Sequence, residues 1–130
     1  MSEPVSRFAY SSAYDPPAPL IRLKIANPGT QAITEDDFLV DSGADITLLR
    51  REIVEVLDLQ YFGSTRIGGV TGLTEEWPVS WISVESPFKT NELIKAVIKP
   101  HSDENILGRD VLNRWKLLFD GPKQQLSFEP

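Results

Sequence analysis

From Leu20 onward, hydrophobic and polar residues alternate with a period of two in several short segments, which is the pattern of β-strands. Leu23 and Ile25 mark one face of the first expected strand. Residues 38–40 form a continuous apolar run that suits a strand buried on both faces, and Asp36-Asp37 before it is expected to lie in a solvated loop. The other expected strands are a hairpin over residues 66–84, a strand over residues 92–99, and a closing hairpin of residues 117–119 and 125–128.

Two segments have apolar residues at intervals of three or four, which indicates short α-helices. The first covers residues 51–58, and the second follows Gly108. Many short strands with two short helices predict an all-β fold. Trp77, Trp81 and Trp115 are expected to pack in its core rather than to form a stacking platform.

The first 18 residues differ from the rest of the chain. They are rich in Ser, Tyr and Pro and show no hydrophobic period. Three prolines at or just after their end, Pro16, Pro17 and Pro19, favour an extended or flexible backbone. A chain of 130 residues can build one hydrophobic core. The sequence therefore predicts a flexible N-terminal segment, residues 1–18, followed by one domain, residues 19–130.

The overall composition excludes several classes of function. The net charge is −6 and Arg50-Arg51 is the longest basic run, so no nucleic-acid partner is expected. The chain has no cysteine and one histidine, which excludes disulfides, thiolate nucleophiles and cysteine-based zinc sites. It begins without a signal-peptide pattern and has no apolar run of about 20 residues. We therefore expect a cytoplasmic protein with no membrane partner, no metal and no other cofactor.

Asp41 is the strongest candidate for a chemical role. It follows the apolar run and precedes Ser42 and Gly43, so its carboxylate is expected at the end of a buried strand, where ionisation is costly. Gly43 allows a sharp turn, and the Ser42 hydroxyl can brace it. The same tripeptide is also ordinary turn chemistry, and taken alone it favours that simpler interpretation. Only its combination with other motifs favours catalysis.

Three motifs, in their order along the chain, resemble those of the retroviral-type (retropepsin-like) aspartic peptidases. Val40-Asp41-Ser42-Gly43-Ala44 resembles the active-site motif of that family. Roughly 65 residues later, residues 106–112 (Ile-Leu-Gly-Arg-Asp-Val-Leu) resemble its second motif, an apolar pair and a glycine before a helix that opens with Arg. Between the two, residues 67–72 (Ile-Gly-Gly-Val-Thr-Gly) take the place of a glycine-rich flap. The resemblance extends over residues 20–128, nearly the whole of the expected domain.

The resemblance implies a closed, barrel-like sheet, a homodimer with a two-fold axis, and an endopeptidase that cleaves a peptide or protein substrate without a metal or a covalent intermediate. Asp41 of each copy is then the catalytic residue, and the two carboxylates share one proton, so activity is expected to peak at mildly acid pH. Asp45 and Arg109 are expected to form an ion pair beside the site. The supporting residues are Ser42, Gly43, Ala44, Asp45 and Arg109, and the flap residues that close over the substrate are Gly68, Gly69, Val70, Thr71 and Gly72.

Two features depart from the family pattern. The chain ends in a hairpin around Asp120-Gly121, where viral members end in one interface strand, so the dimer contacts are expected to differ. Residues 1–18 exceed a minimal viral protease, and an initiator Met without flanking polyprotein suggests a free-standing cellular relative. Two alternatives to a general endopeptidase stay open: a catalytically silent peptide-binding or dimerisation module of the same fold, and a protease whose only substrate is its own N-terminal segment.

Overall fold

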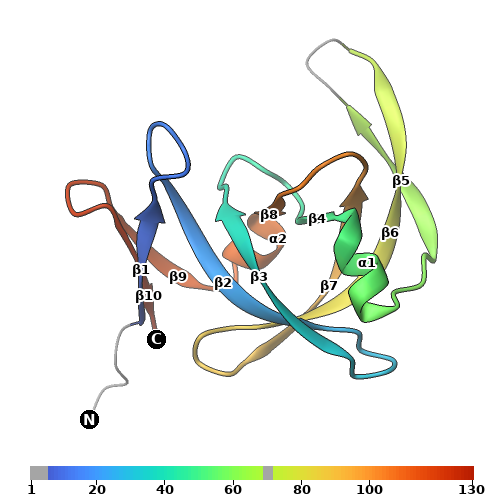
Figure 1. Cartoon of the computed structure of the whole chain (residues 1–130), viewed down its shortest axis with the longest axis horizontal. Coiled ribbons are helices and arrows are strands. Elements are labelled where there is room, and N and C mark those ends of the chain that lie inside the picture. The colour runs from blue at the N-terminus through green and yellow to red at the C-terminus, as the bar shows by residue number, and fades with distance from the viewer. Residues whose placement is uncertain (1–5, 69–71) are drawn as a thin grey trace.

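The predicted all-β fold is confirmed by the computed structural model, which describes residues 6–68 and 72–130 (Figure 1). Short strands dominate this part of the chain, with one short helix in its middle and another near its C-terminal end. In chain order the elements are β1 (Ser6–Ser11), β2 (Ala18–Ala26), β3 (Ile33–Val40), β4 (Leu48–Arg50), α1 (Arg51–Leu57), β5 (Gly63–Gly68), β6 (Thr74–Glu85), β7 (Asn91–Lys99), β8 (Asn105–Leu107), α2 (Arg109–Leu112), β9 (Lys116–Asp120) and β10 (Gln125–Glu129).

The described strands form one sheet in the order β5-β6-β7-β4-β8-β3-β2-β1-β10-β9, and this sheet closes on itself because β6 also pairs with β2. The length of β6 makes the closure possible. Its residues 74–79 pair with β5, residues 79–85 with β7, and residues 83–85 with β2. A ring made of β2, β3, β8, β4, β7 and β6 therefore surrounds the core, in agreement with the expected barrel-like sheet.

The core inside this ring comes from side chains that alternate along the strands. Ile21, Leu23 and Ile25 of β2 are almost completely buried, whereas the charged residues between them are exposed. Phe38 and Val40, from the predicted apolar run, are buried at the end of β3. Each such side chain contributes about 1.5–3 kcal/mol when it leaves water, so the alternation in the sequence locates the face that holds the barrel together.

Of the three tryptophans predicted to pack in the core, Trp115 does so, Trp77 is only partly buried where β6 pairs with β5, and the prediction is wrong for Trp81. Its side chain is 46% exposed and stacks on Phe62, with ring centroids 5.3 Å apart. Val79, two residues before Trp81, and Ile82, directly after it, are both buried. Residues three positions apart on a strand point to opposite faces, so the buried face of β6 changes between residues 79 and 82. This switch occurs where β6 leaves its partner β5 and enters the ring, and it places Trp81 on the outer face.

Ordered structure begins earlier than the sequence suggested. β1 pairs antiparallel with both β10 and β2, and its Phe8 and Tyr10 pack against the core. The Tyr14 hydroxyl donates a hydrogen bond to the Glu104 carboxylate at 2.7 Å. The expectation of a flexible segment is therefore wrong for residues 6–11. β1 is stabilised by pairing with β10 at the far end of the chain, which no local pattern reveals. The prolines that follow it favour a flexible segment instead of a strand.

Asp36 and Asp37 lie inside β3, not in a solvated loop before it. Asp36 accepts hydrogen bonds from Arg50 Nε at 2.7 Å and Asn105 Nδ2 at 2.8 Å. The buried Asn105 also donates to the Asp37 carbonyl oxygen at 3.0 Å and accepts from the Arg50 N–H at 2.9 Å. Burial alone would raise the pKa of Asp36, but the bonds from Arg50 and Asn105 outweigh it and hold that pKa below its usual value. This network ties together β3, β4 and β8.

Both predicted helices are present and short. α1 ends at Leu57 and is capped by Asp58, which adopts a left-handed conformation with φ of 51°, so it closely matches the predicted helix over residues 51–58. α2 follows Gly108 as its N-cap residue. Within residues 6–68 and 72–130, no helix is long and apolar enough to cross a membrane.

Candidate active site

Asp41 stands where β3 ends. β3 and β8 run parallel, with Val40 opposite Leu107. The Asp41 N–H extends this ladder by donating to the Leu107 carbonyl oxygen at 3.1 Å. The fold therefore brings the second sequence motif directly beside the first and anchors the backbone of the candidate catalytic residue to the sheet.

The segment after Asp41 is a tight turn held by its own backbone. The Ala44 N–H donates to the Asp41 carbonyl oxygen at 3.1 Å, and the Gly43 N–H donates to Asp41 Oδ1 at 2.9 Å. A Cβ at position 43 would lie 3.2 Å from the same oxygen, so glycine allows this close approach. Asp41 is only partly buried in one copy of the chain, less than the sequence suggested, because the exposed residues Ser42 and Gly43 carry the turn beyond the sheet.

Arg109 connects the first residue of α2 to this turn at three points. Its N–H donates to the Ala44 carbonyl oxygen at 2.9 Å, and its Nη1 donates to the Ser42 carbonyl oxygen at 2.9 Å. Its Nη2 forms the expected ion pair with Asp45. Both side chains are exposed, so this pair adds little to stability, but the planar guanidinium fixes the path of the turn.

Thr47 and Asp110 also hold the turn. Asp110 belongs to the second sequence motif, but neither residue was predicted as a site residue. The buried Thr47 hydroxyl donates to Asp110 Oδ1 at 2.7 Å and accepts from the Gly108 N–H at 3.1 Å. The Thr47 N–H donates to Asp110 Oδ2 at 3.0 Å. The only available signal was one polar residue inside the apolar run 46–49, which does not reveal a partner so distant in sequence.

Gly108 allows the two motifs to touch through their backbones. A Cβ at this position would lie 2.5 Å from the carbonyl carbon of Ile46 and 2.9 Å from its nitrogen, both closer than any real side chain tolerates. Its φ of −96° is open to any residue. Glycine is therefore required here for close approach, not for backbone freedom.

The predicted glycine-rich hairpin consists of β5 and β6, paired from Gly63 opposite Val79 to Gly68 opposite Thr74. Gly68 is exposed at the end of β5, and Gly72 has a φ of 80°, which favours glycine. The other expected flap residues, Gly69, Val70 and Thr71, lie outside the described residues.

The motifs and their contacts can now be compared with known proteins. The family model of retroviral aspartyl proteases matches residues 16–120, most of the chain. The chain belongs to the retroviral aspartyl protease family. No curated protein matches its sequence.

Solved structures show the same fold for this family member. A retropepsin-like aspartic protease from Rickettsia conorii has a TM-score of 0.63 at 19% identity, over 96% of this chain and 98% of that chain. EIAV protease, solved with the inhibitor HBY-793, has a TM-score of 0.56 at 24% identity, over 75% and 86%. The foamy viral protease-reverse transcriptase, solved with an RNA/DNA hybrid, has a TM-score of 0.52 at 18% identity, over 75% of this chain and 12% of that chain.

The site of this retroviral aspartyl protease family member offers acid–base chemistry. Asp41 presents a carboxylate with one oxygen fixed by a backbone N–H, and the group is accessible from solvent. In the part of the chain that the structure describes, no three His, Asp or Glu side chains gather in a way that could hold a metal ion. One copy of the chain brings one such carboxylate to the turn.

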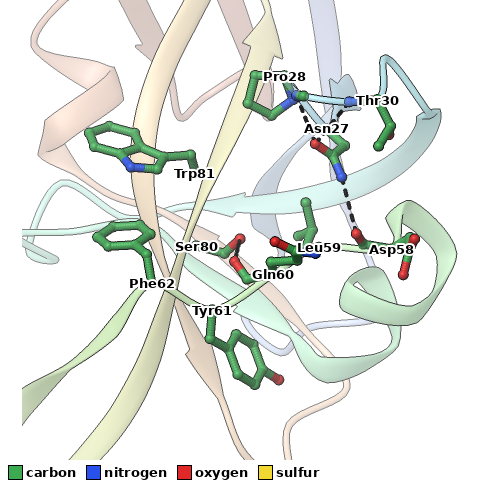
Figure 2. Close-up of a pocket in the computed structure, with 11 residues that line it drawn as sticks. Asn27, Pro28, Thr30, Asp58, Leu59, Gln60, Tyr61, Phe62, Ser80 and Trp81 are labelled. Atoms are coloured by element: carbon green, nitrogen blue, oxygen red, sulfur yellow. Dashed lines mark hydrogen bonds between the residues drawn. The ribbon is translucent and has the colours of Figure 1, made fainter.

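A separate pocket of about 520 Å³ lies between the β2–β3 turn, the segment after α1, and β6 (Figure 2). Its aromatic wall is formed by Tyr61, Phe62 and Trp81, and no candidate active-site residue lines it. The buried Asn27 side chain donates to the carbonyl oxygens of Leu57 and Asp58 at 3.0 and 3.1 Å. In this family member those bonds join the turn to the end of α1, so Asn27 has a structural role.

Proposed function

We propose that this chain is an aspartic endopeptidase that acts as a homodimer, with Asp41 of each copy forming the catalytic pair. The observation that carries the proposal is the position of Asp41, which lies at the end of a sheet strand on a turn that fixes one carboxylate oxygen and leaves the group open to solvent. Membership of the retroviral aspartyl protease family supports the same assignment. Because one copy supplies one such carboxylate, a complete pair requires two copies.

The proposed mechanism is general acid–base hydrolysis. Two carboxylates a few ångströms apart cannot both ionise cheaply, so the pair holds one proton between them, as is general for aspartic proteases. The ionised Asp41 takes a proton from water, whose oxygen attacks the carbonyl carbon of the scissile peptide bond. The protonated Asp41 of the second copy donates its proton to the carbonyl oxygen. The C–N bond then breaks as the pair returns a proton to the leaving nitrogen.

The remaining site residues position this carboxylate and the substrate. Arg109 holds the turn through the Ser42 carbonyl group and the Asp45 carboxylate. In the dimer, we expect the Ser42 hydroxyl to brace the two turns against each other and the exposed Asp45 to contact the bound peptide. Such positioning matters because misplacing reacting groups by about 1 Å can cost a factor of 100 in rate.

The substrate that fits this arrangement is a peptide in an extended conformation. We infer that it lies between the turn at Asp41 and the β5–β6 hairpin, and that it pairs with the protein as an added strand. Gly68 and Gly72 flank the hairpin tip, where glycine lets the backbone bend over a ligand. Closure of the hairpin would exclude water from the reaction.

Cleavage of a mixed peptide library between about pH 3 and pH 8 tests the proposal, because the catalytic pair must be singly ionised to act. Asp41→Asn keeps the size of the side chain and removes its acid–base function, so cleavage should disappear. Asp103→Asn, at an exposed position outside the site, is the matched control and should cleave like the native chain. A folded native dimer that cleaves nothing would favour a peptide-binding or dimerisation module. Equal cleavage by native chain and Asp41→Asn would refute the role of Asp41.

A further inference from the structure

The pocket in Figure 2 lies at a gap in the sheet. β6 pairs with β5 up to Val79 and with β2 from Ser83 onward, so among the described strands residues 80–82 have a neighbour only on the β7 side. The connection between α1 and β5, residues 58–62, lines the pocket together with Ser80 and Trp81. The pocket is therefore built into the closure of the sheet, apart from the turn at Asp41.

Hydrogen bonds hold the walls of this pocket in place. The Asn27 side chain fixes the β2–β3 turn to the end of α1. The Ser80 hydroxyl donates to the Gln60 carbonyl oxygen at 2.8 Å, and the Phe62 N–H donates to the Val79 carbonyl oxygen at 3.1 Å. A ligand would therefore meet a shape that exists before it binds, which lowers the entropy cost of binding.

One end of the pocket is an aromatic surface. The side chains of Tyr61, Phe62 and Trp81 are 50%, 48% and 46% exposed. The rings of Phe62 and Trp81 lie side by side with an interplanar angle of 15° (Figure 2). Aromatic side chains offer a large contact area at a low cost in conformational entropy, because they have only two rotatable bonds. Apolar side chains gathered around a concave surface are typical of a binding site.

The polar groups of the pocket favour a cationic ligand that also accepts hydrogen bonds. Asp58, at the other end of the pocket in Figure 2, is the one charged side chain in its described lining, and no described basic group pairs with it. In the part of the chain that the structure describes, Trp81 Nε1 and the N–H groups of Gln60 and Tyr61 donate to no protein acceptor. The pocket thus combines aromatic rings, free donors and a negative charge.

We propose that this pocket binds a proline-rich segment of a partner protein that carries a basic residue. Proline rings pack on aromatic side chains, and a polyproline helix is extended before it binds, so it can reach from Trp81 to Asp58 at a low entropy cost. Proline has a carbonyl acceptor and no N–H, which matches a site with free donors. The arginine or lysine of the segment then pairs with Asp58. The inference does not depend on the proposed function, since the described lining includes no residue of the turn at Asp41.

Other classes of ligand match the pocket less well. A phosphate or a nucleic acid would place negative charge next to Asp58, which is unfavourable. A purely apolar molecule would cover Asp58 and the free N–H groups without giving them partners, and polar groups are costly to bury in that way. A compact ligand could not touch the aromatic end and Asp58 together, because Figure 2 shows them at opposite ends.

The first test is a binding titration by fluorescence anisotropy. It uses the Asp41→Asn chain, so that the probe is not cleaved, and a short labelled peptide of proline and alanine with one arginine. Trp81→Ala should weaken binding about 30-fold, as loss of a central aromatic contact does. Leu93→Ala, at an exposed leucine outside the pocket, is the matched control and should bind normally. No binding by the Asp41→Asn chain, or equal binding by Trp81→Ala, would overturn the inference.

The second test separates the two parts of the ligand. A peptide with glutamate in place of arginine should bind about threefold or more weakly, and Asp58→Asn should remove this preference. Asparagine also tolerates the left-handed conformation of residue 58, so the end of α1 is kept. A peptide with arginine but no proline should bind at least about tenfold more weakly, because it is less ordered before binding. If it binds equally, the occupant is any basic chain and the proposed class is wrong. An arginine preference that survives in Asp58→Asn would refute the role of Asp58.

The third test locates the peptide through the indole N–H signals in a nitrogen–proton correlation spectrum. The chain has three tryptophans. Trp77 Nε1 donates to the Glu75 carboxylate at 2.9 Å, and Trp115 Nε1 is buried, so the peptide should shift the indole signal of Trp81 and leave the other two in place. Loss of one signal in Trp81→Phe assigns it, and the two unchanged signals show that the variant is folded. A bound peptide that leaves the Trp81 signal unmoved would place its site elsewhere and overturn the inference.

Discussion

Replacing Gly108 by alanine is the sharpest test of how the active-site turn is supported. The added Cβ would lie 2.5 Å from the Ile46 carbonyl carbon and 2.9 Å from its nitrogen, so two backbone segments would have to separate. Alanine adopts the observed φ of −96° without strain, so the whole penalty comes from this steric contact. The variant therefore isolates one contact between the two sequence motifs.

The expected penalty follows from the balance of two effects. Gly-to-Ala replacement restricts the unfolded chain and by itself stabilises a protein by about 0.4–1 kcal/mol. Overpacking costs about 1–3 kcal/mol, and the upper part of that range applies because the obstacle is backbone that cannot rotate away. The Ile46 backbone is held on both sides, by the Ala44–Arg109 and Thr47–Asp110 hydrogen bonds. We expect a net loss of about 1–2 kcal/mol of unfolding free energy, and a shift of the turn that carries Asp41.

The assay is urea unfolding together with peptide cleavage, and Gly121→Ala is the control because a Cβ there would meet nothing within 4 Å. Gly121→Ala should match the native chain within about 0.5 kcal/mol, or be slightly more stable, and should cleave normally. Gly108→Ala should be less stable and at least about tenfold less active, since small displacements of reacting groups cost rate. If both alanine variants behave like the native chain, the turn does not rest on Gly108 and the reasoning fails.

Two further predictions concern Arg109 and Asp36. In Arg109→Lys, the single ammonium group cannot bind the Ser42 carbonyl oxygen and Asp45 together. Peptide cleavage should therefore fall about tenfold or more, while the free energy of unfolding in urea changes by less than about 1 kcal/mol. An unchanged cleavage rate would show that Arg109 does not position the turn. Asp36 has a lowered pKa in the folded state, so its contribution is present at neutral pH and is lost as the pH falls through that pKa. Between about pH 5 and pH 2 the native chain should therefore lose more stability than Asp36→Asn, and parallel losses in urea unfolding would contradict this.

Local patterns in the sequence predicted most of the barrel. The alternation in β2, the hairpins β5–β6 and β9–β10, and both helices are all visible in short windows, because each buries its own periodic apolar face. β1 is different, since its partner β10 lies at the far end of the chain. The buried-face switch that exposes Trp81 is also a property of the closed sheet, not of the strand taken alone.

In the site, too, the sequence predicted the local motifs but not the contacts between distant residues. The two motifs predicted which residues meet, and the Asp45–Arg109 pair is present as expected. The roles of Thr47, Asp110 and Asn105 were not predicted, although Asp110 lies in the second motif. Each is a polar side chain that is costly to bury without partners, and its partners come from other strands, so only the folded chain shows why it is there.

Acid pH acts on the proposed enzyme at two levels. The net charge of −6 makes two copies repel each other at neutral pH, and protonation of surface carboxylates reduces this repulsion. The same change keeps one proton on the Asp41 pair, which the proposed mechanism requires. We therefore expect a lower pH to favour both proposed steps, dimerisation through the net charge of the surface and catalysis through the proton shared by the Asp41 pair.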